Sequence, residues 1–305
     1  MTRPLPAGIT VFERGWLSSN NILIQGAGHA ALIDSGYCTH AEQTLALVGH
    51  ALQERPLDLL LNTHLHSDHC GGNAALQAAY PMLQTLIPPG HAEQVRVWDA
   101  SALTYEATGQ QCPRFRFDAT LQPGTEIDLG GTPWQIHVAP GHDPHSVILF
   151  EPASRTLVSA DALWERGFGV VFPELDGQDA FDEVAATLDV IERLQPALVI
   201  PGHGAPFADA PTAIAFARQR LNGFVQNPAK HLQYAAKVLL KFKLLEQQQM
   251  EQDALLAWAQ GTPYFATTFA KHFASQPFAE AAGQLVQDLV RSGAATVQGT
   301  VVYNA

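Results

Sequence analysis

The sequence predicts an α/β fold in which short apolar strands alternate with helices and carry polar residues at their carboxyl ends. The clearest unit is the apolar run 57–61, which is followed by a histidine-rich loop and then by a helix that starts near Ala74. Three later apolar runs, 134–138, 156–158 and 197–200, each lead to another side chain that can bind metal. Open α/β sheets hold their ligands at this end of the strands, so we expect the functional site there.

The N-terminal part predicts three strands and a helix. The runs 8–12, 21–25 and 30–36 are short, apolar and separated by glycine turns, which is typical of hairpins. Asp34 lies near the end of the third run, where it is either a turn cap or a hydrogen-bond partner of a metal ligand. A helix is predicted over 41–52, because apolar residues recur there at helical spacing and a proline follows.

The loop after the run 57–61 reads Asn62-Thr63-His64-Leu65-His66-Ser67-Asp68-His69-Cys70-Gly71-Gly72. Three histidines and a carboxylate in so short a stretch are not explained by packing. Imidazole and carboxylate groups are ligands of zinc, iron and manganese. The loop therefore predicts a metal site, and Cys70 is expected to be a small buried residue rather than a reactive thiol.

Three more metal-competent side chains follow distant strands: His142 after Gly141, Asp161 in Ser159-Ala160-Asp161, and His203 in Pro201-Gly202-His203-Gly204. Glycine before two of them lets the backbone turn sharply and approach a site closely. Each alone is compatible with an ordinary strand-end residue. Together with the histidine loop they predict one shared site, whereas His145 is expected to hydrogen-bond locally.

The composition changes after residue 210, where glycine turns become rare. Helices are predicted over 213–221, 229–249, 253–259, 262–273 and 278–290, with a hairpin over 293–303. Helices followed by a short hairpin are typical of a winged-helix module. We therefore expect a catalytic domain over 1–210 and a helical, winged-helix-like C-terminal domain over 211–305.

Two aromatic segments have more than one interpretation. Segment 91–120 is either a lid or substrate-binding loop, or a surface helix with aromatic anchors: Trp98, Tyr105, Phe115 and Phe117. Segment 164–172 either lines an apolar acyl pocket or packs in the core; its residues are Trp164, Phe168, Val170, Val171 and Phe172.

Composition narrows the classes of partner. Hydrophobic residues make up 47% of the chain, and 29 acidic against 17 basic residues give a net charge of −12, which argues against nucleic acid or an anionic membrane as a partner. The N-terminus lacks the apolar core of a signal peptide, and no apolar run has the length of a membrane span. We expect a cytoplasmic protein. Its three cysteines, with no CxxC pair, predict neither a disulfide framework nor a thiolate zinc site.

The ordered motifs around His64, His142, Asp161 and His203 resemble the signature of the metallo-β-lactamase-fold hydrolases, over roughly the first two-thirds of the chain. The resemblance implies an αβ/βα sandwich of four layers with a dinuclear metal centre at the open edge between its two sheets. It also implies which side chains bind: His64, His66 and His142 for the first metal, Asp68, His69 and His203 for the second, and Asp161 as the bridge. Zinc is the expected metal because it suits these ligands, with iron and manganese as alternatives.

The same resemblance implies a hydrolase in which a metal-bridging hydroxide attacks a carbonyl and Asp68 takes the proton. The ligand set is similar to that of the glyoxalase II branch, and we expect a small thioester, carboxylic ester or lactone as substrate. A winged-helix-type endonuclease for single-stranded RNA is one alternative, for which Lys230, Lys237, Lys241 and Lys243 would form a basic patch instead of a solvated helix face. A metal-binding sensor without turnover is the other. A homodimer, the native metal and the identity of the substrate are left open.

Overall fold

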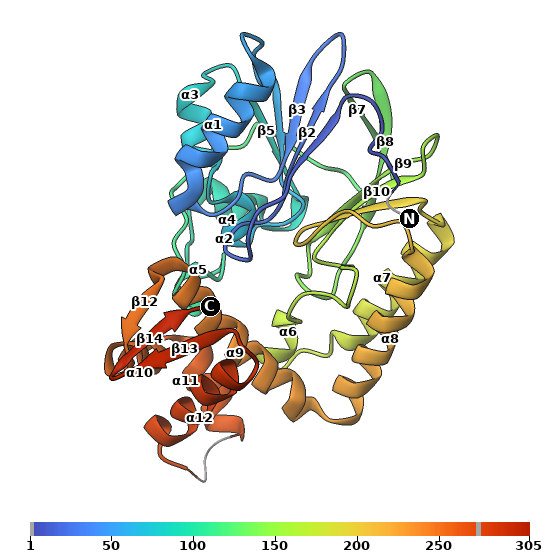
Figure 1. Cartoon of the computed structure of the whole chain (residues 1–305). Coiled ribbons are helices and arrows are strands. Elements are labelled where there is room, and N and C mark those ends of the chain that lie inside the picture. Colours follow the sequence, from blue (N-terminus) through green and yellow to red (C-terminus); the bar gives the residue numbers. More distant parts are fainter. Residues whose placement is uncertain (1–2, 273–275) are drawn as a thin grey trace.

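The computed structural model describes residues 3–272 and 276–305 and contains two large sheets that face each other (Figure 1). In the first sheet the strand order is β1-β2-β3-β4-β5-β6, antiparallel from β1 to β3 and parallel from β3 to β6. Its strands are β1 (Ile9–Phe12), β2 (Asn21–Gln25), β3 (Ala30–Ile33), β4 (Leu59–Leu61), β5 (Gln84–Ile87) and β6 (Ala119–Thr120). The strands predicted in the N-terminal part are confirmed.

The second sheet has the order β11-β10-β9-β8-β7, in which only the pair β10–β11 is parallel. Its strands are β7 (Glu126–Leu129), β8 (Thr132–Val138), β9 (Val147–Glu151), β10 (Thr156–Ala160) and β11 (Leu198–Pro201). Ile33 and Leu61 from the first sheet join Trp134, Val158 and Ile200 from the second in one buried cluster. The inner faces of the two sheets thus share a core.

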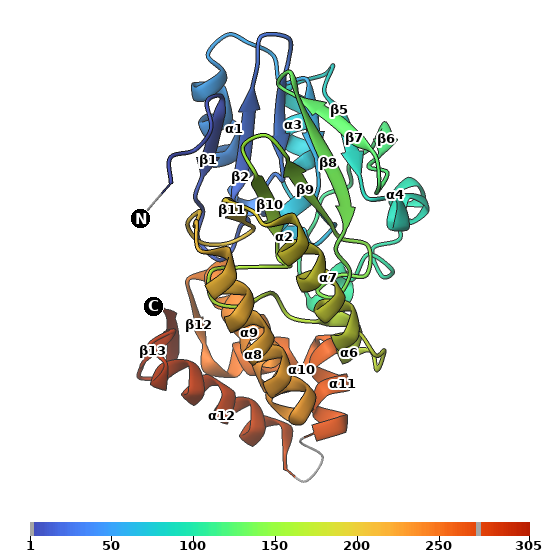
Figure 2. The same cartoon turned by 90° about the vertical axis from the view of Figure 1, so that its right-hand side faces the viewer.

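Helices cover the outer face of each sheet. On the first, α1 (Ala41–Leu52) and α3 (Asn73–Ala79) bury Val48, Leu52 and Leu76 against Leu32 and Leu60, each burial stabilising the fold by about 1.5–3 kcal/mol. On the second lie α7 (Phe181–Leu194) and α8 (Ala210–Gln226), seen in front of the strands in Figure 2. The predicted αβ/βα sandwich is confirmed, and so is the helix over 41–52.

The segment between β5 and β6 folds into η2 (Pro89–His91), α4 (Ala92–Val97), α5 (Tyr105–Thr108) and loops. Trp98, Tyr105, Phe115 and Phe117 all pack in one cluster with the buried Cys70. The interpretation as aromatic anchors is therefore correct for these four residues.

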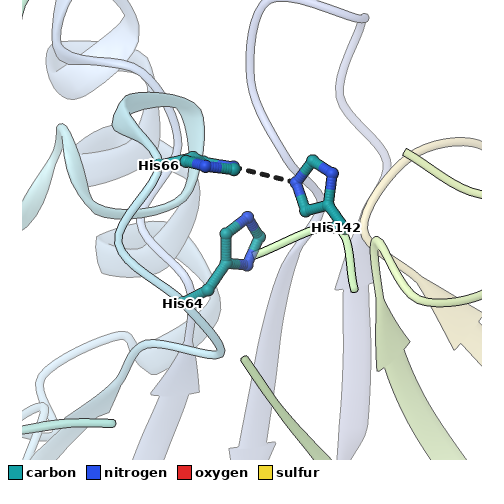
Figure 3. A group of neighbouring side chains, drawn as sticks. All are labelled: His64, His66 and His142. Carbon is teal, nitrogen blue, oxygen red and sulfur yellow. Dashed lines mark hydrogen bonds between the residues drawn. The ribbon is translucent and has the colours of Figure 1, made fainter. Parts of the chain in front are cut away.

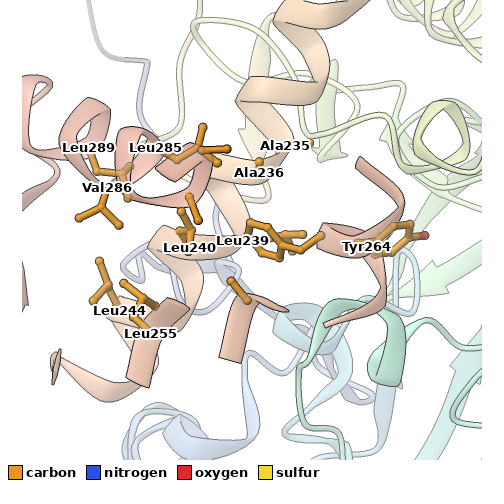
Figure 4. Packing of buried hydrophobic residues seen from close by; sticks show 14 of the residues in the cluster. Ala235, Ala236, Leu239, Leu240, Leu244, Leu255, Tyr264, Leu285, Val286 and Leu289 are labelled. Atoms are coloured by element: carbon orange, nitrogen blue, oxygen red, sulfur yellow. The ribbon is translucent and has the colours of Figure 1, made fainter. Parts of the chain in front are cut away.

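The C-terminal region consists of four helices and a small sheet of order β12-β14-β13 within the described residues. Its elements are α9 (Pro228–Gln247), β12 (Gln249–Glu251), α10 (Gln252–Gly261), α11 (Pro263–His272), α12 (Phe278–Arg291), β13 (Ala295–Gln298) and β14 (Val301–Asn304). Figure 4 shows leucines of α9 and α12 interdigitating around Leu240. The predicted hairpin is present, with β12 as an additional strand.

One predicted helix ends earlier in the structure, and the predicted end of another is not among the described residues. The helix predicted over 229–249 ends at Gln247, because Gln248 has φ 64° and β12 follows directly. Phe273, the last residue of the helix predicted over 262–273, lies outside the described residues.

The C-terminal core contacts the rest of the chain through the loop after β10. Val170 and Leu175, the latter in α6 (Phe172–Leu175), belong to the same cluster as Leu240. The division into domains at residues 210 and 211 stays a prediction. None of the helices in the described part of the chain has the length and apolarity that crossing a membrane requires.

Candidate metal centre

The histidine loop begins where β4 ends and is held by buried amides. The Asn62 side chain donates to the His69 carbonyl oxygen at 3.2 Å and shares hydrogen bonds with the Asn73 side chain at 2.7 and 3.3 Å. The short helix α2 (Ser67–Cys70) follows, with the His69 and Cys70 amides both bonded to the His66 carbonyl. This frame directs the loop side chains toward the space between the sheets.

His64, His66 and His142 form the first group of converging side chains (Figure 3), with nitrogen atoms within 4.8 Å of one another. His66 Nδ1 and His142 Nε2 are 2.8 Å apart. His142 Nδ1 lies 2.5 Å from the Val170 carbonyl oxygen, and since it can only donate there, Nε2 keeps its lone pair for a metal. The preceding Gly141 has φ 131°, and a Cβ there would lie 2.6 Å from Val184.

Asp68, His69 and His203 form a second group, in which the ligand atoms also lie within 4.8 Å of one another. His203 Nε2 lies 3.1 Å from Asp68 Oδ2. The loop that carries His203 is fixed by Asn20, whose side-chain amide donates to the carbonyl oxygens of Pro201 and Gly204 at 3.0 and 2.7 Å. Asn20 was not singled out from the sequence, where a single asparagine carries no signal.

Asp161 lies between the two groups. Its carboxylate oxygens are 3.5 Å from His69 Nε2, 3.4 Å from His142 Nε2 and 3.8 Å from His203 Nε2. A Cβ at Gly202 would lie 2.2 Å from Asp161 Oδ1, so only glycine fits beside the carboxylate. The structure thus brings all seven predicted residues together, from four strand ends.

Asp34 acts on the site through His69. Its Oδ2 accepts a hydrogen bond from His69 Nδ1 at 2.8 Å, and the carboxylate also accepts from the Thr63 amide and hydroxyl, both at 2.8 Å. These contacts fix the tautomer of His69 with Nε2 toward the cluster. Of the two interpretations of Asp34, the structure favours the hydrogen-bond partner.

The donor set suits metal ions. His64 Nε2 and His69 Nε2 are buried and have no hydrogen-bond partner among the described residues, an arrangement that would be unfavourable without a ligand. Burial pushes the pKa of His64 well below its ordinary value and lowers the pKa of His66 to about 4. Burial alone would raise the pKa of Asp161, but the adjacent His203 and His69 hold it well below its ordinary value. At neutral pH His64 and His66 are therefore neutral and Asp161 is ionised, as metal binding requires. Burial alone would lower the pKa of His69, but Asp34, Asp161 and Asp68 raise it well above its ordinary value, so a metal ion that binds His69 would displace a proton.

A cavity of about 80 Å³ opens beside the cluster. Of the predicted acyl-pocket segment, Trp164, Val170 and Phe172 line it, whereas Phe168 and Val171 pack in the core behind α7. Thr108 and Gln110 also line it, which agrees with the interpretation of segment 91–120 as a substrate-binding loop for these two residues. Further lining residues were not predicted: Trp16, and Tyr234, Val238, Leu239 and Phe242 of α9. Their positions depend on long-range packing, which short sequence patterns do not encode.

A family comparison covers the whole of this site. The model of the metallo-beta-lactamase superfamily matches residues 14–203, which include all seven converging residues. This chain belongs to the metallo-beta-lactamase superfamily. A crystal structure of a superfamily member from Thermus thermophilus has the same fold at 18% identity, with a TM-score of 0.61 over 99% of this chain and 100% of that chain.

Two other similar proteins bear on the chemistry of this superfamily member. A hydroxyacylglutathione hydrolase from Anaeromyxobacter dehalogenans (strain 2CP-C) is 31% identical over 197 residues, which are 63% of this chain and 65% of the relative. The match thus spans slightly less than two thirds of that relative. The protein TTHA1623, solved in a di-iron-bound form, is 26% identical, with a TM-score of 0.55 over 68% of this chain and 98% of that chain. The predicted resemblance to the glyoxalase II-like branch is confirmed.

Proposed function

We propose that this protein is a metal-dependent hydrolase with two divalent ions, which cleaves the acyl C–S bond of a thioester or the acyl C–O bond of a carboxylic ester. The proposal rests on the convergence of seven histidine and aspartate side chains at one place. Within this group, His64 Nε2 and His69 Nε2 are buried and have no hydrogen-bond partner among the described residues. The hydroxyacylglutathione hydrolases among its relatives support a thioester as the substrate class.

The proposed ligand assignment follows the spacing of the side chains. His64, His66 and His142 would hold one ion, Asp68, His69 and His203 the other, and Asp161 would bridge them. Zinc suits this mixture of imidazole and carboxylate, and the di-iron form of TTHA1623 supports iron as the alternative.

Two bound metal ions supply the reaction with an activated water molecule of lowered pKa and with polarisation of the substrate carbonyl. The chain itself supplies the proton acceptor. Asp68 is the least buried of the carboxylates in the cluster, with its side chain 14% exposed toward the cavity. Burial alone would raise the pKa of Asp68, but His69 and His203 hold it below its ordinary value, so the carboxylate is ready to take a proton.

Two aromatic side chains beside the cluster have different roles: one orients a proposed ligand and the other excludes water. Trp164 Nε1 donates to Asp161 Oδ1 at 3.2 Å, which fixes the proposed bridging carboxylate. Phe172 packs against both His66 and His142 at ring distances of 4.8 and 5.7 Å. An apolar acyl group placed on this wall would displace water from the reacting carbonyl.

Replacing Asp68 tests the proposal. In metal-loaded Asp68→Asn, hydrolysis of acetyl and hexanoyl thioesters should fall by at least about 100-fold, because the amide cannot accept the proton. Metal content by mass spectrometry should accompany the rates, since loss of a ligand also lowers occupancy. The exposed Glu165→Gln, a few residues beyond Asp161, is the matched control. Undiminished rates in Asp68→Asn, or no more than about one metal ion per metal-loaded wild-type chain, would contradict the proposal.

A further inference from the structure

A second cavity of about 340 Å³ adjoins the metal-site cavity. Trp16, Tyr234, Val238 and Phe242 line both cavities, so the two spaces are neighbours along one face of α9. The rest of its lining includes Leu245 of α9, Leu289 of α12, and Ser292 and Ala294, which follow α12. Its volume is within the range of pockets that hold small organic ligands.

The walls of this cavity combine aliphatic surface with positive charge. Val238, Leu245 and Leu289 are apolar, while Lys237 and Lys241 are the charged residues in its lining and no acidic residue is among them. This is unusual for a chain with 29 acidic and 17 basic residues. The cavity therefore favours a ligand with an apolar body and a negative charge.

The two lysines differ in what they contact. Lys241 Nζ donates to the carbonyl oxygens of Ala294 and Ala305 at 2.6 and 2.8 Å and to Asn304 Oδ1, so it ties α9 to the C-terminal strands. Lys237 is half-buried and has no hydrogen-bond or ion-pair partner among residues 3–272 and 276–305. Its charge is therefore available to an anionic ligand in this cavity, with which it would form a charge-assisted hydrogen bond.

We propose that this cavity binds the non-reacting end of the substrate, an aliphatic chain that carries a carboxylate or phosphate, with Lys237 as the residue that pairs with the anion. The inference rests on the proposed function, because it places the scissile carbonyl at the metal centre and the chain along α9. Trp16, 54% exposed, lines both cavities and thus lies where the two adjoin. The aliphatic walls favour a hydrocarbon chain over the stacked bases of RNA.

Binding of decanoate, decyl phosphate and decanol to the metal-loaded protein, measured by titration calorimetry, tests the proposal. Decanoate or decyl phosphate should bind wild type more tightly than decanol does. Lys237→Met should weaken anion binding at least about ten-fold and leave decanol unchanged, because the variant cannot form the charge-assisted hydrogen bond. Lys230→Met is the matched control, because Lys230 lies on the same helix but is exposed and outside the cavity. The ratio of the dissociation constants of decanoate and decyl phosphate then shows whether the site prefers a carboxylate or a phosphate.

Equal anion binding by Lys237→Met and Lys230→Met would overturn the inference, because the carboxylate would then be held elsewhere, including on the metals. Displacement of decanoate by a single-stranded RNA oligonucleotide in wild type but not in Lys237→Met would also overturn it, in favour of a phosphate-backbone site. Leu245→Trp, which fills the cavity, should abolish binding of all three probes, and retained binding would place them elsewhere. If thioesters are not hydrolysed but Lys237-dependent binding is found, only the proposed function fails.

Discussion

Asp34 adopts a left-handed backbone conformation, with φ 58°, directly after β3. This conformation lets its side chain turn back to the loop after β4, where it contacts Thr63 and His69. Asparagine and aspartate tolerate positive φ better than other residues with a side chain. Two properties of the residue, its charge and its backbone freedom, can therefore be separated by mutation.

Asp34→Asn should keep the backbone and the size of the side chain, but it removes the charge that supports His69 and replaces one of the two acceptor oxygens by an NH2 donor. We expect metal affinity to fall by about 10- to 100-fold, as is usual for partners that orient a metal-bound imidazole. Competition with a chromophoric chelator measures the affinity directly. Unchanged affinity would show that the carboxylate only caps the turn.

His231 gives the fold a dependence on pH away from the metal centre. It is buried, its Nε2 accepts a hydrogen bond from the Val171 amide at 3.1 Å, and burial together with Arg220 lowers its pKa to about 4. Because the unfolded chain binds a proton near pH 6.5 and the folded one does not, stability falls as the pH drops from about 6.5 toward 4. The shift corresponds to roughly 3 kcal/mol at the lower end of that window.

His231→Gln retains an acceptor but does not titrate. Urea denaturation at several pH values gives the free energy of unfolding of wild type and of this variant. The difference between them should be constant above about pH 6.5. Below that pH, the variant should become progressively more stable relative to wild type. A difference that does not change with pH would contradict the assignment.

At the level of elements, two turns bring the sheets into contact. A Cβ added to Gly26, between β2 and β3, would lie 1.7 Å from the carbonyl oxygen of Gly130, between β7 and β8. That atom belongs to the backbone and cannot rotate away. Gly26→Ala should therefore lower the free energy of unfolding by about 1–3 kcal/mol.

Gly28→Ala is the control for this prediction, because a Cβ at Gly28, in the same turn, has nothing within 4 Å. Thermal unfolding of both variants compares them under one condition. Equal stability of the two would show that the turns separate easily and that the sheets do not depend on this contact.

Strand ends were predictable from the sequence because they are local. The runs that became β4, β8, β10 and β11 are short and mostly apolar, and residues that follow them soon afterwards are metal ligands by type, so the cluster could be inferred before any packing was known. The helix face that lines the cavity beside the site was not predictable. Tyr234, Val238 and Phe242 occupy one face of α9, where their spacing is that of any buried helix. The two lysines of α9 that line the second cavity likewise turned out to differ, since Lys241 hydrogen-bonds to the C-terminal residues and Lys237 has no such hydrogen bond among the described residues.

For the whole molecule, the metal centre joins both sheets. Its side chains come from the loop after β4 in the first sheet and from the ends of β8, β10 and β11 in the second. Any ion that binds the folded state and not the unfolded one stabilises the fold, by about 4 kcal/mol at a thousand-fold excess over its dissociation constant.

Removing metal with a chelator should therefore lower the melting temperature by several degrees, and adding zinc back should restore it. Differential scanning calorimetry, with the chelator dialysed away before the scan, measures the shift. A melting temperature that is the same with and without metal would show that the sheets are held together without it.

The stacking of Trp16 on His203, at 5.2 Å between ring centres and 12° between ring planes, gives the protein an internal optical reporter. An imidazole that gains positive character interacts more strongly with the indole face and alters its emission. Trp164 meets both rings edge-on, at 5.2 and 5.6 Å. The occupancy of the site that contains His203 can therefore be followed through tryptophan fluorescence, with no label attached and no substrate known.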